Sequence, residues 1–289
     1  MSYWFLFALG SALGFSIYHA ISKSLSLKIS KAEITFWSFF FASIILLSIS
    51  FFNGLPELGD QFLKAVLITS ILNIIAFPIL LQAYRLADFS AVFSMFLLTP
   101  LFMLLTSYLI LKEIPSLLGV VGMIILLSGL FIIIQGSRAE SKINGTNYKK
   151  GIYLGLLVSF IFSICVNFDK MAVLNSDFIF AGGTIAGLIA LGTLPFLIYF
   201  QRKTRLNIKN IEKKTILLML AMVITFCFTS IFHNLALISG LASYTIAIKR
   251  TSIIFGVIWG LIFFKEKRFL PKLIGSVIAA LGVIVILLS

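Results

Sequence analysis

Residues 243–266, SYTIAIKRTSIIFGVIWGLIFFKE, are apolar enough to cross a bilayer, yet they contain two adjacent cations, Lys249 and Arg250. In a helix that rises 1.5 Å per residue, this pair would lie roughly 10–12 Å below one membrane surface. A Lys or Arg at the centre of a bilayer costs about 2.5–3.5 kcal/mol on insertion scales, so such residues face a bundle interior, a water-filled cavity or an anionic partner. We interpret this stretch as the core of a binding site.

A second interpretation is that both side chains extend along the lipid to the membrane surface, because Lys and Arg have long apolar stems. Neighbouring side chains on a helix diverge by about 100°, so both cannot follow one lipid-facing stripe without strain. The adjacency of the two cations therefore favours the binding site.

The composition identifies the class of protein. Of its 289 residues, 60% are hydrophobic and 11% are charged, and the mean hydropathy is +1.12, whereas about 25% of residues are charged in soluble domains. Apolar runs of about 20 residues, the length of a membrane-spanning helix, recur throughout the chain. We expect an integral membrane protein in a lipid bilayer. The net charge of +13 lies in short loops, where it reports orientation and anionic lipid rather than a nucleic-acid partner.

Cys165 and Cys227 lie in apolar runs, where thiols behave as small hydrophobic groups, so we expect no disulfide or redox chemistry. The N-terminal run lacks a preceding basic region and a small-residue cleavage site, and we interpret it as a span rather than a signal peptide. The sequence predicts no catalytic residue, metal site or cofactor.

Ten apolar segments are predicted to be membrane-spanning helices, because a lipid-exposed backbone must satisfy its own hydrogen bonds. Polar runs and Pro or Gly residues separate them. The expected spans are 3–21, 34–52, 62–85, 89–111, 116–135, 152–170, 178–200, 215–238, 242–264 and 273–288.

The chain also contains an internal repeat. A looser match at an offset of 147 residues superposes Ser16 on Ser163 and Lys23 on Lys170. An ungapped match at an offset of 153 superposes Ala83 on Ala236, Ser90 on Ser243, Phe102 on Phe255, Lys112 on Lys265, Glu113 on Glu266, Gly122 on Gly275 and Gly129 on Gly282.

These matches divide the chain into two halves, 1–137 and 148–289, joined by a linker at 138–147. Each half holds five spans, an odd number, so the second half must enter the membrane from the opposite side. We predict an all-α membrane protein of ten transmembrane helices arranged as two inverted five-helix repeats. Inverted repeats are typical of alternating-access transporters, with the substrate site where the halves meet.

The basic residues predict the orientation. Counted together with the adjoining span ends, which hold Lys64, Arg85 and Lys170, the loops after spans 1, 3, 5, 7 and 9 carry 3, 1, 4, 6 and 4 Lys or Arg residues, whereas those after spans 2, 4 and 6 carry one each and that after span 8 none. By the positive-inside rule, the odd-numbered loops are cytoplasmic and both termini lie outside.

The segments 90–129 and 243–282 resemble the paired repeats of the ten-helix EamA branch of the drug/metabolite transporter superfamily, and the resemblance spans the whole chain. It is carried by the small-residue start of the fourth and ninth spans, the Lys-Glu helix ends at 112–113 and 265–266, and the paired glycines that follow. The resemblance implies that spans 1, 3, 4, 6, 8 and 9 surround a central cavity while spans 5 and 10 lie at the periphery.

The segment AIKRTSIIF, residues 247–255, also resembles the Lys-Arg segment of the triose-phosphate translocators. There the pair holds the substrate phosphate, which implies the same role for Lys249 and Arg250.

Polar groups inside spans are costly, so each is a candidate for the site. Asp169 is a candidate for coupling to a proton or counter-ion, although a plain salt bridge with its neighbour Lys170 is an equal alternative. For the Lys-Glu pairs we expect a structural role at the helix ends. The candidates for substrate binding are Lys249, Arg250, Asn234, His233, Asn73, Tyr84, Asn167 and His19.

Together these features favour a secondary transporter for a small organic anion or zwitterion, such as an amino acid, a carboxylate or a phosphorylated metabolite, in a bacterial inner or plasma membrane. Arg would supply a two-point fork and Lys a point charge. The alternatives are a multidrug or cation exporter, which the cationic pair disfavours, and a flippase for a lipid-linked anion. A membrane-embedded enzyme is disfavoured because the chain lacks paired intramembrane carboxylates and a metal cluster.

Overall fold

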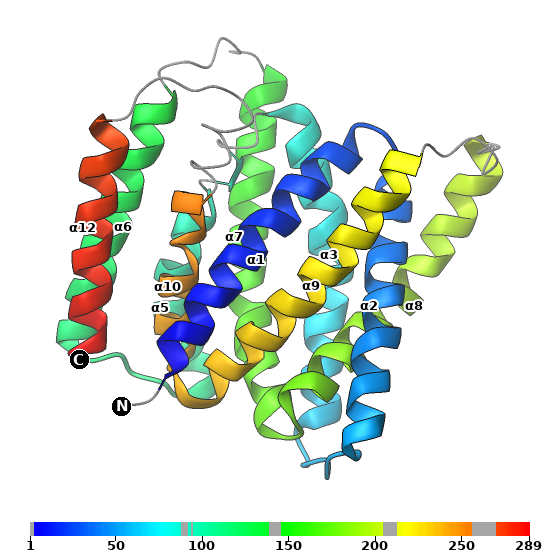
Figure 1. The fold of residues 1–289 in the computed structure, drawn as a ribbon, viewed down its shortest axis with the longest axis horizontal. Helices are drawn as coiled ribbons and strands as arrows, with labels where there is room; N and C mark the ends of the chain where they lie inside the picture. Colours follow the sequence, from blue (N-terminus) through cyan, green and yellow to red (C-terminus); the bar gives the residue numbers. More distant parts are fainter. Residues whose placement is uncertain (1–2, 88–91, 94, 139–145, 205–212, 256–269) are drawn as a thin grey trace.

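A computed structural model describes residues 3–87, 92–93, 95–138, 146–204, 213–255 and 270–289, and within these ranges the chain is helical with no strand. Six helices, α1, α2, α3, α7, α8 and α9, are long and apolar enough to cross a membrane. The elements are α1 (Trp4–Ser26), α2 (Lys31–Asn53), α3 (Phe62–Leu86), η1 (Phe96–Leu98), α5 (Thr99–Leu111), α6 (Leu117–Arg138), α7 (Thr146–Leu174), α8 (Phe178–Thr204), α9 (Lys213–Ser239), α10 (Ala242–Lys249) and α12 (Leu270–Leu287) (Figure 1).

Several helices extend beyond the predicted apolar spans. At the start of α2, Ser30 and Glu33 form a capping box in which each side chain accepts a hydrogen bond from the other residue's backbone N–H. This cap adds a polar first turn to the helix. Similarly, α7 begins at Thr146, inside the predicted linker. Hydropathy marks the part of a helix that lies in lipid, whereas polar turns outside the lipid can stay helical.

The described parts of the fourth and ninth spans are not regular helices. In the fourth, a 3₁₀ turn at Phe96–Leu98 precedes α5. In the ninth, α10 ends at Lys249, the backbone turns at Arg250 and Thr251, and helix resumes at 252–255. The two interruptions fall at equivalent positions when the sequence is shifted by 153 residues. Helices broken near the bilayer midplane mark the binding sites of many transporters.

The helix pairs agree with the predicted inverted repeats. Span 1 packs against span 8 (α1 with α9), and its counterpart, span 6, packs against span 3 (α7 with α3). Spans with the same place in each repeat also pair, as α2 with α8, α5 with α10 and α6 with α12. In Figure 1, α1 and α7 run in opposite directions, and both termini lie at one end of the molecule. These contacts are those of a pseudo-two-fold relation between halves of opposite orientation.

The paired glycines of the repeat explain the peripheral helix pair, α6 and α12, at the edge of the bundle (Figure 1). A Cβ atom added to Gly129 would lie 2.4 Å from the Ala279 backbone nitrogen, and one added to Gly282 would lie 2.3 Å from that of Leu126. Only glycine therefore permits this close approach of the backbones. The peripheral position agrees with that implied for spans 5 and 10.

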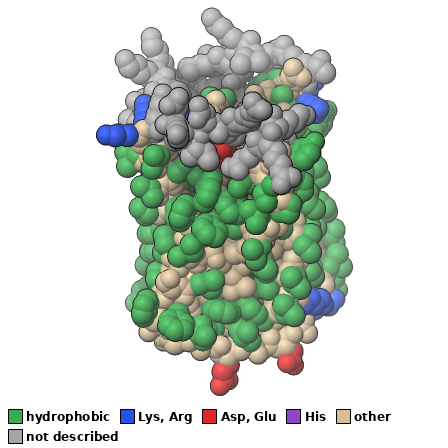
Figure 2. Space-filling model, turned by 90° about the vertical axis from the view of Figure 1, so that its right-hand side faces the viewer, with side chains coloured by type: hydrophobic (Ala, Val, Ile, Leu, Met, Phe, Trp, Pro, Cys, Tyr) green, Lys and Arg blue, Asp and Glu red, His purple; other side chains and the backbone are tan. Residues whose placement is uncertain are grey.

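Apolar side chains cover the flank of the bundle in Figure 2, and the coloured charged side chains lie toward its two ends. Large hydrophobic residues are exposed along α2, α3, α8 and α9. This distribution is the one expected of helices whose outer faces contact lipid.

The orientation is testable with single cysteines on a background without Cys165 and Cys227. Leu27 and Leu58 are exposed, and they lie in the loops after α1 and α2. We expect a cysteine at Leu58 to react with an impermeant thiol reagent in intact cells, and one at Leu27 to react only after the cells are opened. The reverse pattern would overturn the predicted orientation but leave the inverted repeat intact.

Candidate functional site

A central cavity lies between the two repeats, and residues of α1, α2, α3, α7, α8, α9 and α10 line it, as does Arg250 just after α10. The empty space within it, open solvent included, is about 880 Å³. The resemblance did not include spans 2 and 7 among the cavity-lining helices, yet both contribute to the wall, through Phe39 of α2 and Gly182, Ile185 and Ile189 of α8.

Lys249 and Arg250 both line the cavity, where the break after α10 places them. Their exposed fractions are only 7% and 2%, so neither side chain extends to the membrane surface. The interpretation as lipid-facing cations is therefore wrong.

Aromatic rings surround the two cations. Lys249 Nζ lies 4.9 Å from the ring centre of Phe15, and Arg250 Cζ lies 5.4 Å from that ring and 5.3 Å from the ring of Phe96. Such contacts stabilise a cation by about 0.5–1 kcal/mol at exposed sites and by about 2 kcal/mol or more when the cation is desolvated. They offset part of the burial cost but supply no opposite charge.

The guanidinium of Arg250 has unused hydrogen-bonding capacity. Within the described part of the chain, its Nε and Nη1 atoms are buried and have no hydrogen-bond partner, and the same holds for Nδ1 of His233. No described carboxylate forms an ion pair with Lys249 or Arg250. Buried donors are normally satisfied, so the guanidinium of Arg250 is poised to bind an anion.

Asp169 of α7 lines the same cavity, and its Oδ1 accepts a 2.6 Å hydrogen bond from Thr69 of α3. Asn73, one turn further along α3, also lines the cavity and donates to the backbone oxygen of Thr69 at 2.8 Å. The cavity thus contains an acidic group as well as two cations. A ligand could contact both.

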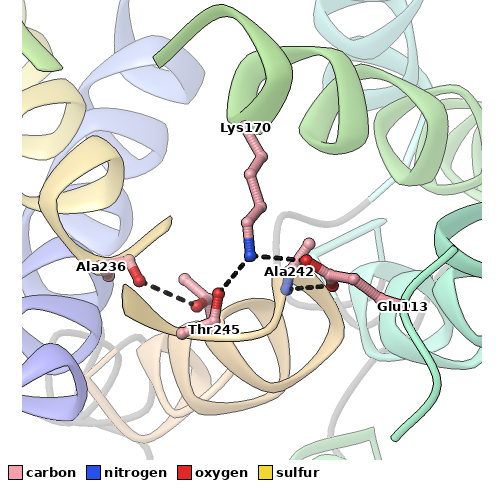
Figure 3. Close-up of polar contacts among 6 residues, drawn as sticks. Glu113, Lys170, Ala236, Ala242 and Thr245 are labelled. Atoms are coloured by element: carbon pink, nitrogen blue, oxygen red, sulfur yellow. Dashed lines mark hydrogen bonds and ion pairs between the residues drawn. The ribbon is translucent and has the colours of Figure 1, made fainter. Parts of the chain in front are cut away.

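The salt bridge considered between Asp169 and Lys170 is wrong. Consecutive helical side chains point in different directions, and Lys170 points away from the cavity to Glu113, which follows α5 in the other repeat (Figure 3). Glu113 therefore does more than close its own helix end, because it also accepts a hydrogen bond from the backbone of Ala242.

The remaining candidates divide into two groups. His233, Asn234 and His19 line the cavity with Asn73, and Asn234 donates to the backbone oxygen of Phe178 at 2.7 Å. Tyr84 and Asn167 are fully buried outside it.

The two buried side chains contact neighbouring helices instead. The hydroxyl of Tyr84 lies 3.1 Å from Nδ1 of His19, while Asn167 donates to Thr106 at 3.1 Å and to the backbone of Ser163. These contacts suit residues that position the wall rather than touch a ligand.

An aromatic layer in the cavity wall was not anticipated from the sequence. Tyr18, Phe39, Phe77 and Phe226 come from four helices and pack with ring centres 4.7–6.5 Å apart. A much smaller cavity, also lined by Tyr18 and Phe77, lies beside this layer. The sequence contains one indication of aromatic residues at the cavity, because the 147-residue offset superposes Phe15 on Phe162. In the structure both of these rings contact Phe96.

Among the described residues, no group of three or more His, Cys, Asp or Glu side chains could hold a metal ion.

Comparisons with known proteins identify the family. A solved structure described as "Crystal structure of protein" has a TM-score of 0.77 and 15% sequence identity, over 100% of this chain and 97% of that chain; at this identity the match shows the fold alone. No curated protein matched the chain. The model of the EamA-like transporter family matches residues 2–135 and 149–288, one segment in each predicted half. The expected family and the ten-helix membrane fold are thus confirmed: this multi-pass membrane protein belongs to the EamA-like transporter family.

Proposed function

We propose that this transporter moves a small organic anion or zwitterion, whose carboxylate or phosphate binds Arg250 and Lys249. The observation that supports this proposal is the pair of buried Arg250 nitrogens, Nε and Nη1, which lack partners among the described residues. Each of these nitrogens belongs to a different two-point edge of the guanidinium, which it shares with Nη2, and such an edge matches the two oxygens of a carboxylate or phosphate.

The acidic group favours a zwitterion over a simple anion. Asp169 can accept a hydrogen bond from an ammonium or hydroxyl group of the cargo, since Thr69 occupies only one of its oxygens. Phe15, Phe77 and Phe162 provide apolar wall for the rest of the ligand. A compound with an acidic group, a cationic group and a modest apolar body, such as an amino acid, would use all three features.

Transport would proceed by alternating access. The cavity lies between inverted repeats, and exchange of conformation between them would open it first to one side and then to the other. From its sequence context Asp169 is also a candidate for coupling to a proton or counter-ion, and this role is a second hypothesis for the same residue. We place the protein in a bacterial plasma membrane, with its termini outside.

The proposal can be tested by thermal unfolding of the purified protein with three matched ligands: an amino acid, the corresponding acid without the amino group, and the corresponding amine without the carboxyl group. A ligand at 100 times its dissociation constant stabilises the folded state by about 2.7 kcal/mol. We expect the amino acid to stabilise most, the acid less and the amine not at all. Stabilisation by amines alone would overturn the proposal and favour a cation exporter.

A further inference from the structure

Glu113 and Lys170 form an ion pair that also binds the ends of two helices (Figure 3). Lys170 Nζ lies 2.5 Å from Glu113 Oε1, and the two side chains are only 10% and 11% exposed. Lys170 also donates to the backbone oxygen of Gly240 at 2.6 Å, and the backbone N–H of Ala242 donates to Glu113 Oε2 at 2.8 Å. The pair therefore joins the end of α9 to the start of α10.

This cluster connects the two repeats at one end of the cavity. Glu113 belongs to the first repeat, and Lys170, Gly240 and Ala242 belong to the second. A second contact lies beside it, because the backbone N–H of Ser116 donates to the hydroxyl of Tyr244 at 2.9 Å. Since α10 runs from Ala242 to Lys249, the cluster holds one end of the helix that carries the substrate-binding cation at its other end.

The repeat places a related contact at the opposite end of the bundle. Lys23 superposes on Lys170 at the 147-residue offset, and it donates to the backbone oxygens of Tyr84 and Ala87 at the end of α3. Ala87 superposes on Gly240 at the 153-residue offset. In each repeat, a lysine of the first helix thus binds the backbone at the end of the third helix. Because the repeats are inverted, the two lysines lie at opposite ends of the bundle.

We propose that Glu113 and Lys170 form a latch that holds its end of the cavity closed and must break each time that end opens. Separated charges are costly inside a protein but are hydrated once water enters, so opening exchanges the ion pair for solvation. When one partner is removed, the other charge is buried without a partner in the closed state but is hydrated in the open state. The equilibrium between the two states therefore shifts toward the open state. The proposal depends on alternating access but not on the identity of the cargo.

The test uses the native Cys165, which lines the cavity and is 2% exposed, as a reporter in a Cys227→Ala background. The rate of its alkylation is measured on purified protein without substrate. We expect Glu113→Gln and Lys170→Met to raise this rate about tenfold, because a hydrogen bond to a charged group contributes at least that factor.

A gentler variant, Ala242→Pro, removes only the N–H that binds Glu113. Proline is favoured at the first position of a helix, and the extended backbone of Leu241 (φ −60°, ψ 140°) accommodates it. We expect a smaller increase in alkylation from this variant, which keeps the proposal testable if the charge variants fold poorly.

Two controls separate opening from general loosening. Glu57→Gln removes an exposed carboxylate from the loop after α2 and should leave the rate unchanged. In a Cys165→Ala background, Cys227, which is buried outside the cavity wall, should react at the parent rate in every latch variant. Equal acceleration at Cys227, or an unchanged Cys165 rate in folded latch variants, would overturn the latch whatever the protein transports.

Discussion

The Arg250→Ala variant is expected to lose the stabilisation that carboxylate or phosphate ligands give the purified protein, while the ligand-free protein still folds. Two charge-assisted hydrogen bonds at about 1.5–3 kcal/mol each correspond to at least a hundredfold loss of affinity. The substitution removes contacts with the rings of Phe15 and Phe96, but it also removes a buried charge without an ionic partner among the described residues. Removal of a buried charge that lacks an ionic partner offsets the lost ring contacts, so the variant should still fold.

The measurement is the ligand-induced shift in unfolding temperature, together with uptake into proteoliposomes. Arg250→Lys should restore only part of the shift, because an ammonium cannot reproduce a planar two-point fork. Lys249→Ala should weaken binding less than Arg250→Ala.

Arg85→Ala is the matched control, since the Arg85 side chain binds the backbone oxygens of Ser26 and Ile29 outside the cavity. It should lower the unfolding temperature but keep the ligand-induced shift. If the variant with alanine at both 249 and 250 transports at the parent rate with unchanged apparent affinity, the cationic site is not the substrate site.

Much of the fold could be predicted from the sequence, because lipid imposes strict rules on it. A span must be apolar and helical, so hydropathy located the long described helices, although polar end turns such as the start of α7 at Thr146 lie outside the predicted spans. The offset of 153 residues aligned Gly122 and Gly129 with Gly275 and Gly282, and Gly129 and Gly282 are points where α6 and α12 touch. The odd number of spans in each repeat then required inversion.

Features that depend on side-chain direction could not be predicted. Asp169 and Lys170 are neighbours in sequence, but Asp169 faces the cavity whereas Lys170 contacts Glu113 of the other repeat. Only the packing of α7 determines these two directions. The chain has 30 Phe residues, and the sequence does not indicate which of their rings lie beside Arg250. The backbone break at Arg250 also lacks the Pro or Gly that would have marked it.

The Asp169→Asn variant is expected to lose the preference for a zwitterion while it keeps the binding of the matched simple acid. Asparagine has nearly the same shape, and its carbonyl oxygen can still accept the hydrogen bond from Thr69, so the cavity wall should be preserved. The variant removes the negative charge that would face the ammonium group of the cargo. Close charge pairs in binding sites have coupling energies of about 1.5–7 kcal/mol, so the amino acid should bind at least about tenfold more weakly.

The same variant distinguishes this role from proton coupling. If Asp169 carries a proton, Asp169→Asn should bind the amino acid with parent affinity, but a pH gradient should no longer drive uptake. The control is Asp177→Asn, because Asp177 accepts hydrogen bonds from the backbone N–H groups of Ile179 and Phe180 at the start of α8, a cap that asparagine can also form. This control should change neither affinity nor coupling. Parent affinity and parent coupling in Asp169→Asn would exclude both roles and leave the cationic pair as the sole charged determinant of binding.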